Sequence, residues 1–257
     1  MIKDASAFVR KCSPCQKHAN HLHNPATFMK IMESPCPFDM WGMDIVGKLP
    51  HATGQREYLI VAVDYFTKWF EVEPLAKISE KEVIKFIWQN LICRFGIPRA
   101  LVTDNGTQFQ GGKLKSWLEE LKIKQLFTSV NNPEASGQAE VTNMIILQQL
   151  RTRLGENKES WVDELSGVLW AYCTTPREST QEMPFSLVYG TEAVIPSEIG
   201  KETWRIKSYD NSGNSKSRRI DLDLLDEKRE VAERRIHVYK NKMARAYDDK
   251  VRPQKFK

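Results

Sequence analysis

Residues 57–64 form a near-continuous apolar run, EYLIVAVD, rich in β-branched side chains. A strand with one face in water alternates apolar and polar residues, whereas this run is apolar at successive positions and suits a strand buried on both faces. Such a strand lies in the middle of a sheet that other elements cover on both sides. The run therefore predicts an α/β fold with a central sheet flanked by helices.

The neighbouring segments predict the order of elements from strand to helix. A helix is expected from Ser79, where the sequence SEKE has the pattern of a capping box, to Gly96, which precedes Pro98. A shorter helix follows Gly112. Further strands are expected at residues 41–49, 69–75, 100–103 and 124–129, which gives a mixed five-stranded sheet.

The second half of the chain predicts helices. Residues 131–137 carry turn signals and predict a loop, and the apolar spacing after it predicts helices over 141–154 and 161–172. Residues 207–217 predict a polar linker. Residues 220–249 predict a long helical arm, about 42 Å at 1.5 Å per residue, whose heptad seam would pair with another helix. The seam consists of Leu225, Ala232, Ile236, Tyr239, Met243 and Ala246.

Charge and cysteine content narrow the function classes. The net charge is +5. From residue 201 onward the chain contains 17 Lys and Arg residues and 10 Asp and Glu residues. This basic surplus is typical either of contact with a phosphate backbone or of a solvated charged helix. No apolar stretch of about 18 residues and no signal-peptide pattern occurs, so neither a membrane span nor secretion is expected. Five unevenly placed cysteines indicate a reducing compartment, the cytoplasm or the nucleus.

Three carboxylates are the candidate chemistry. Asp44 lies in a predicted strand, Asp104 ends another, and Glu140 lies at the start of a helix, with 59 and 35 residues between them. In an open α/β sheet these positions can converge on one edge, where ligands generally bind. Hard oxygen ligands suit Mg²⁺ or Mn²⁺, and two such ions can clamp the oxygens of a phosphodiester displacement.

Each carboxylate also has a structural interpretation of its own. Asp104-Asn105-Gly106 has the composition of a turn after a strand, and Glu140 would complement the dipole at a helix N-terminus. Only the joint spacing of the three favours catalysis over these alternatives.

The strings around these carboxylates give the chain a family resemblance. The chain resembles the integrase of gypsy-type long-terminal-repeat (LTR) retrotransposons, in the retroviral integrase superfamily, over nearly its whole length. Any one string alone would be weak, and the combination is specific. The matching strings are Pro37-Phe38, Trp41-Gly42-Met43-Asp44, Val63-Asp64-Tyr65-Phe66-Thr67-Lys68-Trp69, Thr103-Asp104-Asn105-Gly106-Thr107-Gln108-Phe109, Gly137-Gln138-Ala139-Glu140, Leu169-Trp170-Ala171-Tyr172 and Pro184-Phe185-Ser186-Leu187-Val188-Tyr189-Gly190.

The resemblance implies a ribonuclease H-like core with a DDE triad of Asp44, Asp104 and Glu140 that binds two Mg²⁺ or Mn²⁺ ions, and Asp64 lies outside the triad. The implied activity is trimming of element DNA ends followed by attack of the 3′ hydroxyls on target DNA. Residues 36–200 would be the core, 201–219 a linker and 220–257 a basic helical arm. Predicted DNA contacts are Lys68, Arg99, Lys124, Asn131, Gly137, Gln138 and Asn143.

The chain departs from the family pattern at both ends. Residues 1–35 match a remnant of the N-terminal zinc module: Cys12 and Cys15 fit its second half, but the preceding histidine pair is absent. His18, His21 and His23 follow the cysteines in the wrong order, so no functional zinc site is expected. The C-terminal DNA-binding barrel of relatives is also absent, which indicates a truncated element copy.

Three function hypotheses follow. The first is an integrase core active in metal-dependent transfer on DNA, working as a homo-oligomer because two DNA ends must be joined in concert. The second is an inactive truncated integrase that serves only as a nucleic-acid-binding or assembly module. The third is a cellular ribonuclease H-like nuclease that cuts RNA in a hybrid.

Overall fold

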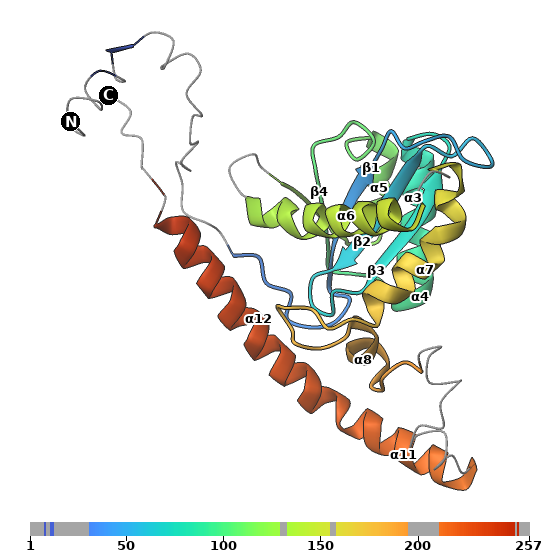
Figure 1. The fold of residues 1–257 in the computed structure, drawn as a ribbon, viewed down its shortest axis with the longest axis vertical. Helices are drawn as coiled ribbons and strands as arrows, with labels where there is room; N and C mark the ends of the chain where they lie inside the picture. Colours follow the sequence, from blue (N-terminus) through green and yellow to red (C-terminus); the bar gives the residue numbers. More distant parts are fainter. Residues whose placement is uncertain are drawn as a thin grey trace.

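The computed structural model of this protein describes residues 8, 11, 12, 31–128, 133–154, 158–194, 211–249 and 251. Within the helices, the side chains of residues 133–142, 151, 158, 211 and 212 lie outside this description. A mixed five-stranded sheet forms the centre of the molecule, with helices on both faces and a long helical segment below it (Figure 1). This confirms the predicted fold class.

The sheet has the strand order β3-β2-β1-β4-β5. The strands β1 to β3 pair antiparallel, whereas β4 pairs parallel with both β1 and β5. The apolar run of residues 57–64 is the strand β2, next to the centre of the sheet, as predicted. The strands are β1 (Met40–Val46), β2 (Tyr58–Asp64), β3 (Phe70–Leu75), β4 (Ala100–Thr103) and β5 (Lys124–Phe127).

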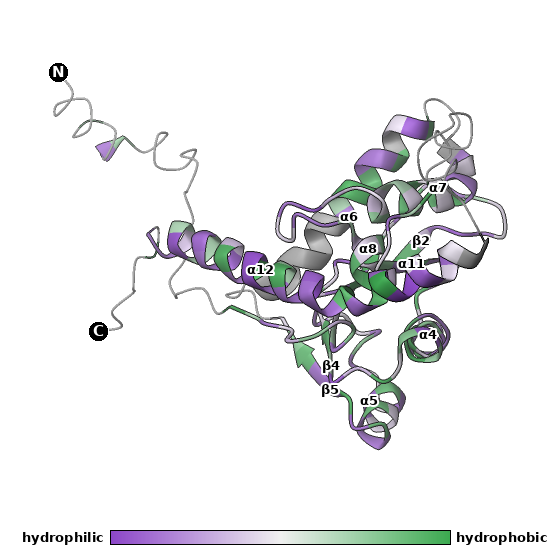
Figure 2. Ribbon diagram, turned by 90° about the horizontal axis from the view of Figure 1, so that it is seen from below, coloured by the Kyte–Doolittle hydropathy of each residue, from purple (hydrophilic) through white to green (hydrophobic). Residues whose placement is uncertain are grey.

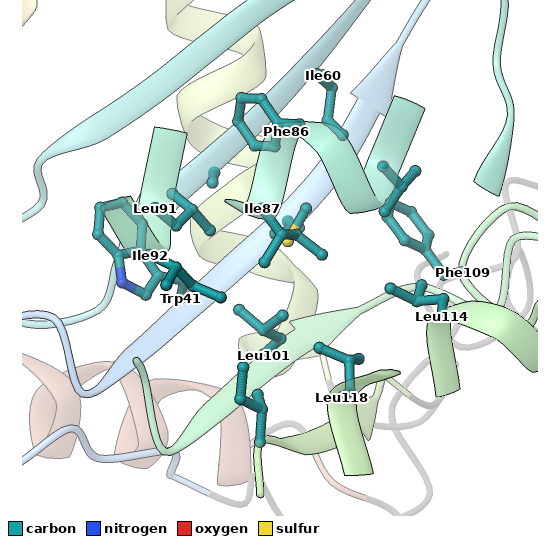
Figure 3. Close-up of a cluster of buried hydrophobic side chains, with 14 of the residues drawn as sticks. Trp41, Ile60, Phe86, Ile87, Leu91, Ile92, Leu101, Phe109, Leu114 and Leu118 are labelled. Carbon is teal, nitrogen blue, oxygen red and sulfur yellow. The ribbon is translucent and has the colours of Figure 1, made fainter. Parts of the chain in front are cut away.

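One face of the sheet is covered by α3 (Glu80–Phe86), the π-helical turn η1 (Ile87–Ile92), α4 (Cys93–Phe95) and α5 (Gly112–Glu120). Figure 3 shows Trp41, Ile60 and Leu101 from three strands meeting the helix side chains in this core. The hydroxyl of Ser79 accepts a hydrogen bond from the backbone of Glu82, as the capping pattern predicts.

The other face is covered by α6 (Pro133–Leu154) and α7 (Trp161–Cys173) (Figure 1). A short 3-10 turn, η2 (Lys158–Ser160), comes directly before α7. Leu59, Val61 and Val63 of β2 point to this face, and Ile60 points to the opposite one. Apolar residues at successive positions of β2 therefore supply two separate cores, because side chains alternate across a strand.

The predicted loop at residues 131–137 is partly wrong, because α6 is already helical from Pro133. Proline is favoured at the first helical position, since its missing N–H has no partner there in any case and its φ already suits a helix. Glu140 consequently lies about two turns into the helix, deeper than the sequence alone predicts.

The C-terminal segment forms two helices, α11 (Asn211–Asp223) and α12 (Leu225–Asp248), where one helix from residue 220 was predicted. Part of the predicted linker is therefore helical. Figure 2 shows alternating hydrophilic and hydrophobic stripes along α12. Its buried residues are Leu225, Ala232, Ile236, Lys240 and Ala244, so Met243 and Ala246 of the predicted seam face outward.

Basic side chains hold α12 against its own core. Lys228 and Arg229 donate to backbone carbonyls at the end of α8 (Pro184–Tyr189), and Arg235 donates to Thr180 and Glu182. Cations are favoured at a helix C-terminus, where carbonyl groups lack partners. Several basic residues of the C-terminal segment therefore bind α12 to the core. None of the described helices is long and apolar enough to cross a membrane.

Candidate active site

The pairing of β1 with β4 carries the first two candidate carboxylates to the same end of the sheet. These parallel strands pair with a constant offset of 60 residues, from Met40 with Ala100 to Gly42 with Val102. Extended by two residues, the same offset aligns Asp44 with Asp104. Residue 44 shares a face of the sheet with Gly42, which it follows by two residues of β1, and Asp104 comes directly after the last residue of β4.

Asp44 is half-buried and held from two directions. Its Oδ1 accepts a hydrogen bond from the backbone N–H of Ile45 at 2.7 Å, and its Oδ2 accepts from Nδ2 of Asn143 at 2.6 Å. Asn143 is 6% exposed, and its amide oxygen has no hydrogen-bond partner within the described structure. The buried amide group of Asn143 thus restricts the orientation of the Asp44 carboxylate.

Asp104 is exposed, and the turn that follows it holds its carboxylate. Oδ1 accepts from the backbone N–H of Gly106 at 2.9 Å, an interaction typical of aspartate at a turn. A Cβ on residue 106 would contact Nε2 of Gln108 and lie 2.9 Å from the Asp104 Oδ1, so a larger residue here would make these side chains shift. Asn105 donates to the Thr128 carbonyl at 3.1 Å, which ties this turn to the end of β5.

Glu140 lies on α6, and its side chain is outside the described structure. Its position on the helix is informative, because Asn143 follows it by three residues and residues i and i+3 share a helix face. Since Asn143 contacts Asp44, that face of α6 lies over β1, on which α6 packs. Among the described side chains, no three His, Cys, Asp or Glu residues gather closely enough to hold a metal. The convergence of Glu140 with the two aspartates stays a prediction.

Two predicted DNA contacts have other roles in the structure. Lys68 is 7% exposed, and its ammonium group donates to the carbonyl of Tyr65 at 2.7 Å, so this side chain is not on the surface as predicted. Asn143 was predicted to face DNA, but it is buried and donates to Asp44. The contact of Asn143 with Asp44 was not predicted from the sequence, although Asn143 follows Glu140 by three residues and this spacing was a usable signal.

Arg99 and Lys124 lie at the other end of the sheet from the aspartates. Arg99 precedes β4 and Lys124 begins β5, whereas Asp104 follows β4. Five residues of extended chain from Arg99 to Asp104 span roughly 16 Å. Arg99 is also paired with both carboxylate oxygens of Asp39, at 2.8 to 3.2 Å. Contact of these two cations with DNA stays a prediction, but they do not surround the carboxylates.

The remaining predicted sites lie largely outside the described structure. Asn131, Cys15 and the histidines at 18, 21 and 23 are outside it, as are the side chains of Gly137 and Gln138, although those two residues are on α6. Cys12 is described as a half-buried free cysteine. The zinc prediction is therefore untested.

Asp64 is a buried carboxylate at the end of β2, where it pairs with Trp41 of β1, whereas Asp44 pairs with Val61. It is 0% exposed and accepts hydrogen bonds from the backbone of Phe38 and from both the backbone and the hydroxyl of Thr67. Burial raises the pKa of Asp64 to about 6, and the bonds from Thr67 limit that rise. With its donors inside the protein, Asp64 has a structural role.

Comparison with known proteins points to a family. Residues 34–133 match the family described as "Integrase core domain". The chain is 28% identical over 200 residues to the "Transposon Tf2-3 polyprotein" and, equally, to the "Transposon Tf2-4 polyprotein" of Schizosaccharomyces pombe. These matches cover 77% of this chain but only 15% of either polyprotein, so the chain spans a small part of these relatives.

A solved structure shows the same fold. It is described as the simian T-cell lymphotropic virus intasome in complex with PP2A regulatory subunit B56 gamma. The match has a TM-score of 0.57 and 22% identity, and it covers 76% of this chain and 69% of that one. At this identity the likeness concerns the fold alone.

Proposed function

We propose, from the premise that this chain carries the integrase core domain of an LTR-retrotransposon integrase, that it catalyses polynucleotidyl transfer on DNA. The general activity of this family is metal-dependent strand transfer. For this chain the proposed steps are trimming of element DNA ends and joining of the freed 3′ hydroxyls to target DNA. The observation that supports the proposal is the parallel register of β1 and β4, from Met40 with Ala100 to Gly42 with Val102, whose constant offset equals the separation of Asp44 and Asp104 in the sequence.

The donor set fits divalent cations. Asp44 and Asp104 offer carboxylate oxygens, and Glu140 precedes Asn143, which donates to Asp44, by three residues on α6. Oxygen-only ligands of this kind suit Mg²⁺ or Mn²⁺. When bound, two such ions would stabilise charge on the attacking and leaving oxygens of an in-line displacement.

The residues of this chain prepare that site by restricting the carboxylates. The Asn143 amide fixes one oxygen of Asp44, and the Gly106 N–H fixes one oxygen of Asp104. Preorganised ligands need little rearrangement when charge develops on the phosphorus, which is the main protein contribution to this chemistry. Covalent attachment of DNA to the protein is not required by this mechanism.

DNA and further copies of the chain are the proposed partners. Joining two DNA ends in concert needs more than one active site. Large apolar side chains are exposed on helices of both faces of the sheet, among them Trp88 of η1 at 49% and Trp170 of α7 at 40%. Exposed tryptophans are enriched at protein interfaces.

The experiment incubates the purified chain with labelled element-end DNA duplexes and Mg²⁺ or Mn²⁺. We expect nicked and joined DNA products, and a loss of at least about a thousandfold in Asp104→Asn, because the metal supplies several kcal/mol of transition-state stabilisation. Asp39→Asn is the matched control, since that carboxylate lies at the opposite end of β4 and pairs with Arg99.

Three outcomes would contradict the proposal. Products that persist unchanged in Asp104→Asn would show that the nicking comes from elsewhere. Salt-sensitive DNA binding without turnover would favour an assembly module. Cleavage of RNA in a hybrid, without joining of DNA, would favour a ribonuclease H-like nuclease.

A further inference from the structure

The strand β5 forms an open edge of the sheet. Within the part of the chain that the structure describes, β4 is its only strand neighbour. An open edge presents unpaired backbone groups to any extended segment that lies alongside it. The exposure of Phe127, 46% at the end of this strand, shows that this edge reaches the surface.

The ladder of β5 shows which backbone groups face outward. The N–H of Lys124 donates to the Arg99 carbonyl at 3.0 Å, and the N–H of Thr128 donates to the Thr103 carbonyl at 2.9 Å. In a parallel ladder, alternate residues bond to the same neighbour. Gln125 and Phe127 therefore direct their N–H and C=O groups away from β4, which leaves two donors and two acceptors along the edge.

A groove of about 760 Å³ lies between this strand and α5. Its apolar wall includes Leu118 and Phe127. Three exposed lysines, Lys115, Lys122 and Lys124, line it together with one glutamate, Glu119. Over the described ranges no ion pair engages these lysines. The groove is thus positively charged around an apolar wall.

We infer that this groove binds an acidic, extended peptide segment of a partner protein, which adds a strand to the free edge of β5. Backbone pairing with Gln125 and Phe127 would align the segment, and alternate side chains would contact the apolar wall. Acidic residues would neutralise the lysines. The outward backbone groups favour a peptide over a nucleic acid, because only a peptide strand matches their donor and acceptor spacing. The inference is independent of catalysis at Asp44 and Asp104.

The test measures fluorescence polarisation of a labelled peptide of alternating glutamate and valine with the full chain at low salt. A peptide of alternating lysine and valine is the charge control. A third peptide keeps the glutamate and valine sequence but carries N-methyl groups on the amides that would pair with β5. We expect binding of the first peptide and at least about tenfold weaker binding of the other two, because backbone hydrogen bonds and ion pairing are lost.

Variants of the chain test the same contacts from the protein side. Phe127→Pro removes an outward N–H, and the ladder bonds to β4 stay, because proline is tolerated at an edge strand. We expect binding at least about fivefold weaker in this variant and in the double variant Lys122→Glu with Lys124→Glu. Lys242→Glu, on the exposed part of α12, is the matched charge control and should bind as the unaltered chain does.

Hydrogen exchange gives a direct readout that does not depend on any variant. The amides of Gln125 and Phe127 should gain protection when the first peptide is bound. Equal binding of the N-methylated peptide would overturn the inference, because attraction would then be ionic only. Absence of peptide binding would overturn it as well. Displacement of the peptide by single-stranded DNA that binds equally to Phe127→Pro would assign the lysines to a nucleic-acid surface instead.

Discussion

Asp44 and Asp64 are two aspartates on adjacent strands whose surroundings differ sharply. Asp64 is completely buried and accepts three hydrogen bonds from Phe38 and Thr67. Asp44 is half-buried, with the Asn143 amide and its own neighbour Ile45 as donors, and it lies at the end of the sheet where Asp104 is exposed. A carboxylate that is completely buried among internal donors stabilises a turn, whereas a half-buried one beside an exposed aspartate is accessible to a cation. The surroundings of each carboxylate, more than its residue type, thus separate a structural from a functional role.

The largest expected effect that separates the two aspartates is the pH dependence of stability caused by Asp64. Its folded pKa of about 6 lies above the ordinary value of 3.8, so the folded state holds this proton more tightly than the unfolded state does. Its contribution to stability is complete below pH of about 4 and is lost as the pH rises through 6. We expect the unfolding free energy of the protein, relative to Asp64→Asn, to fall by about 3 kcal/mol across this range.

Urea unfolding of the protein and of Asp64→Asn at a series of pH values measures this difference. Asp226→Asn serves as the control for the loss of an exposed aspartate, because that side chain is 91% exposed. Parallel pH profiles for the protein and Asp64→Asn would contradict the assignment of a buried, titrating carboxylate to position 64.

A smaller effect is expected from the substitution of Asn143, the residue that donates a hydrogen bond to Asp44. Asn143→Ala removes the 2.6 Å hydrogen bond to Asp44. We expect DNA joining to fall about tenfold and the half-saturating Mn²⁺ concentration to rise, because in the proposed mechanism Asn143 orients Asp44, a metal ligand. Titration of Mn²⁺ in the joining assay separates this from a loss of folded protein.

Met144→Ala is the matched control for that experiment, since Met144 is the next residue on α6 and is 61% exposed. Equal losses in both variants, or an unchanged Mn²⁺ requirement in Asn143→Ala, would show that Asn143 does not act through Asp44.

Most of the core fold could be predicted from local sequence patterns. The apolar run of β2, the Ser79 cap and the Gly96 stop each act within a few residues, so the sequence contains the whole signal. The start of α6 at Pro133 was not predicted, because turn-forming residues also occur in the first turn of a helix. The division of the C-terminal arm into α11 and α12, and its docking through Lys228 and Arg229, depend on tertiary contacts that no local pattern contains.

The candidate site shows the same division between local and tertiary information. The motif strings point to Asp44 and Asp104, and the structure adds the parallel pairing of the two strands, β1 and β4, on which or next to which these residues lie. The roles of Lys68 and Asn143 could not be predicted from residue type, because lysine and asparagine are common both at DNA surfaces and in buried hydrogen bonds. Burial, which only the fold reveals, decides between the two.

The most direct test of the central claim, that Asp44, Asp104 and Glu140 together bind the catalytic cations, is Mn²⁺ binding measured by electron paramagnetic resonance. The experiment compares the protein with Asp44→Asn, Asp104→Asn and Glu140→Gln, each checked for folding by circular dichroism. We predict that each substitution weakens Mn²⁺ binding by at least about tenfold, since each removes a charged ligand. Binding by Glu140→Gln that equals that of the unaltered protein would contradict the claim.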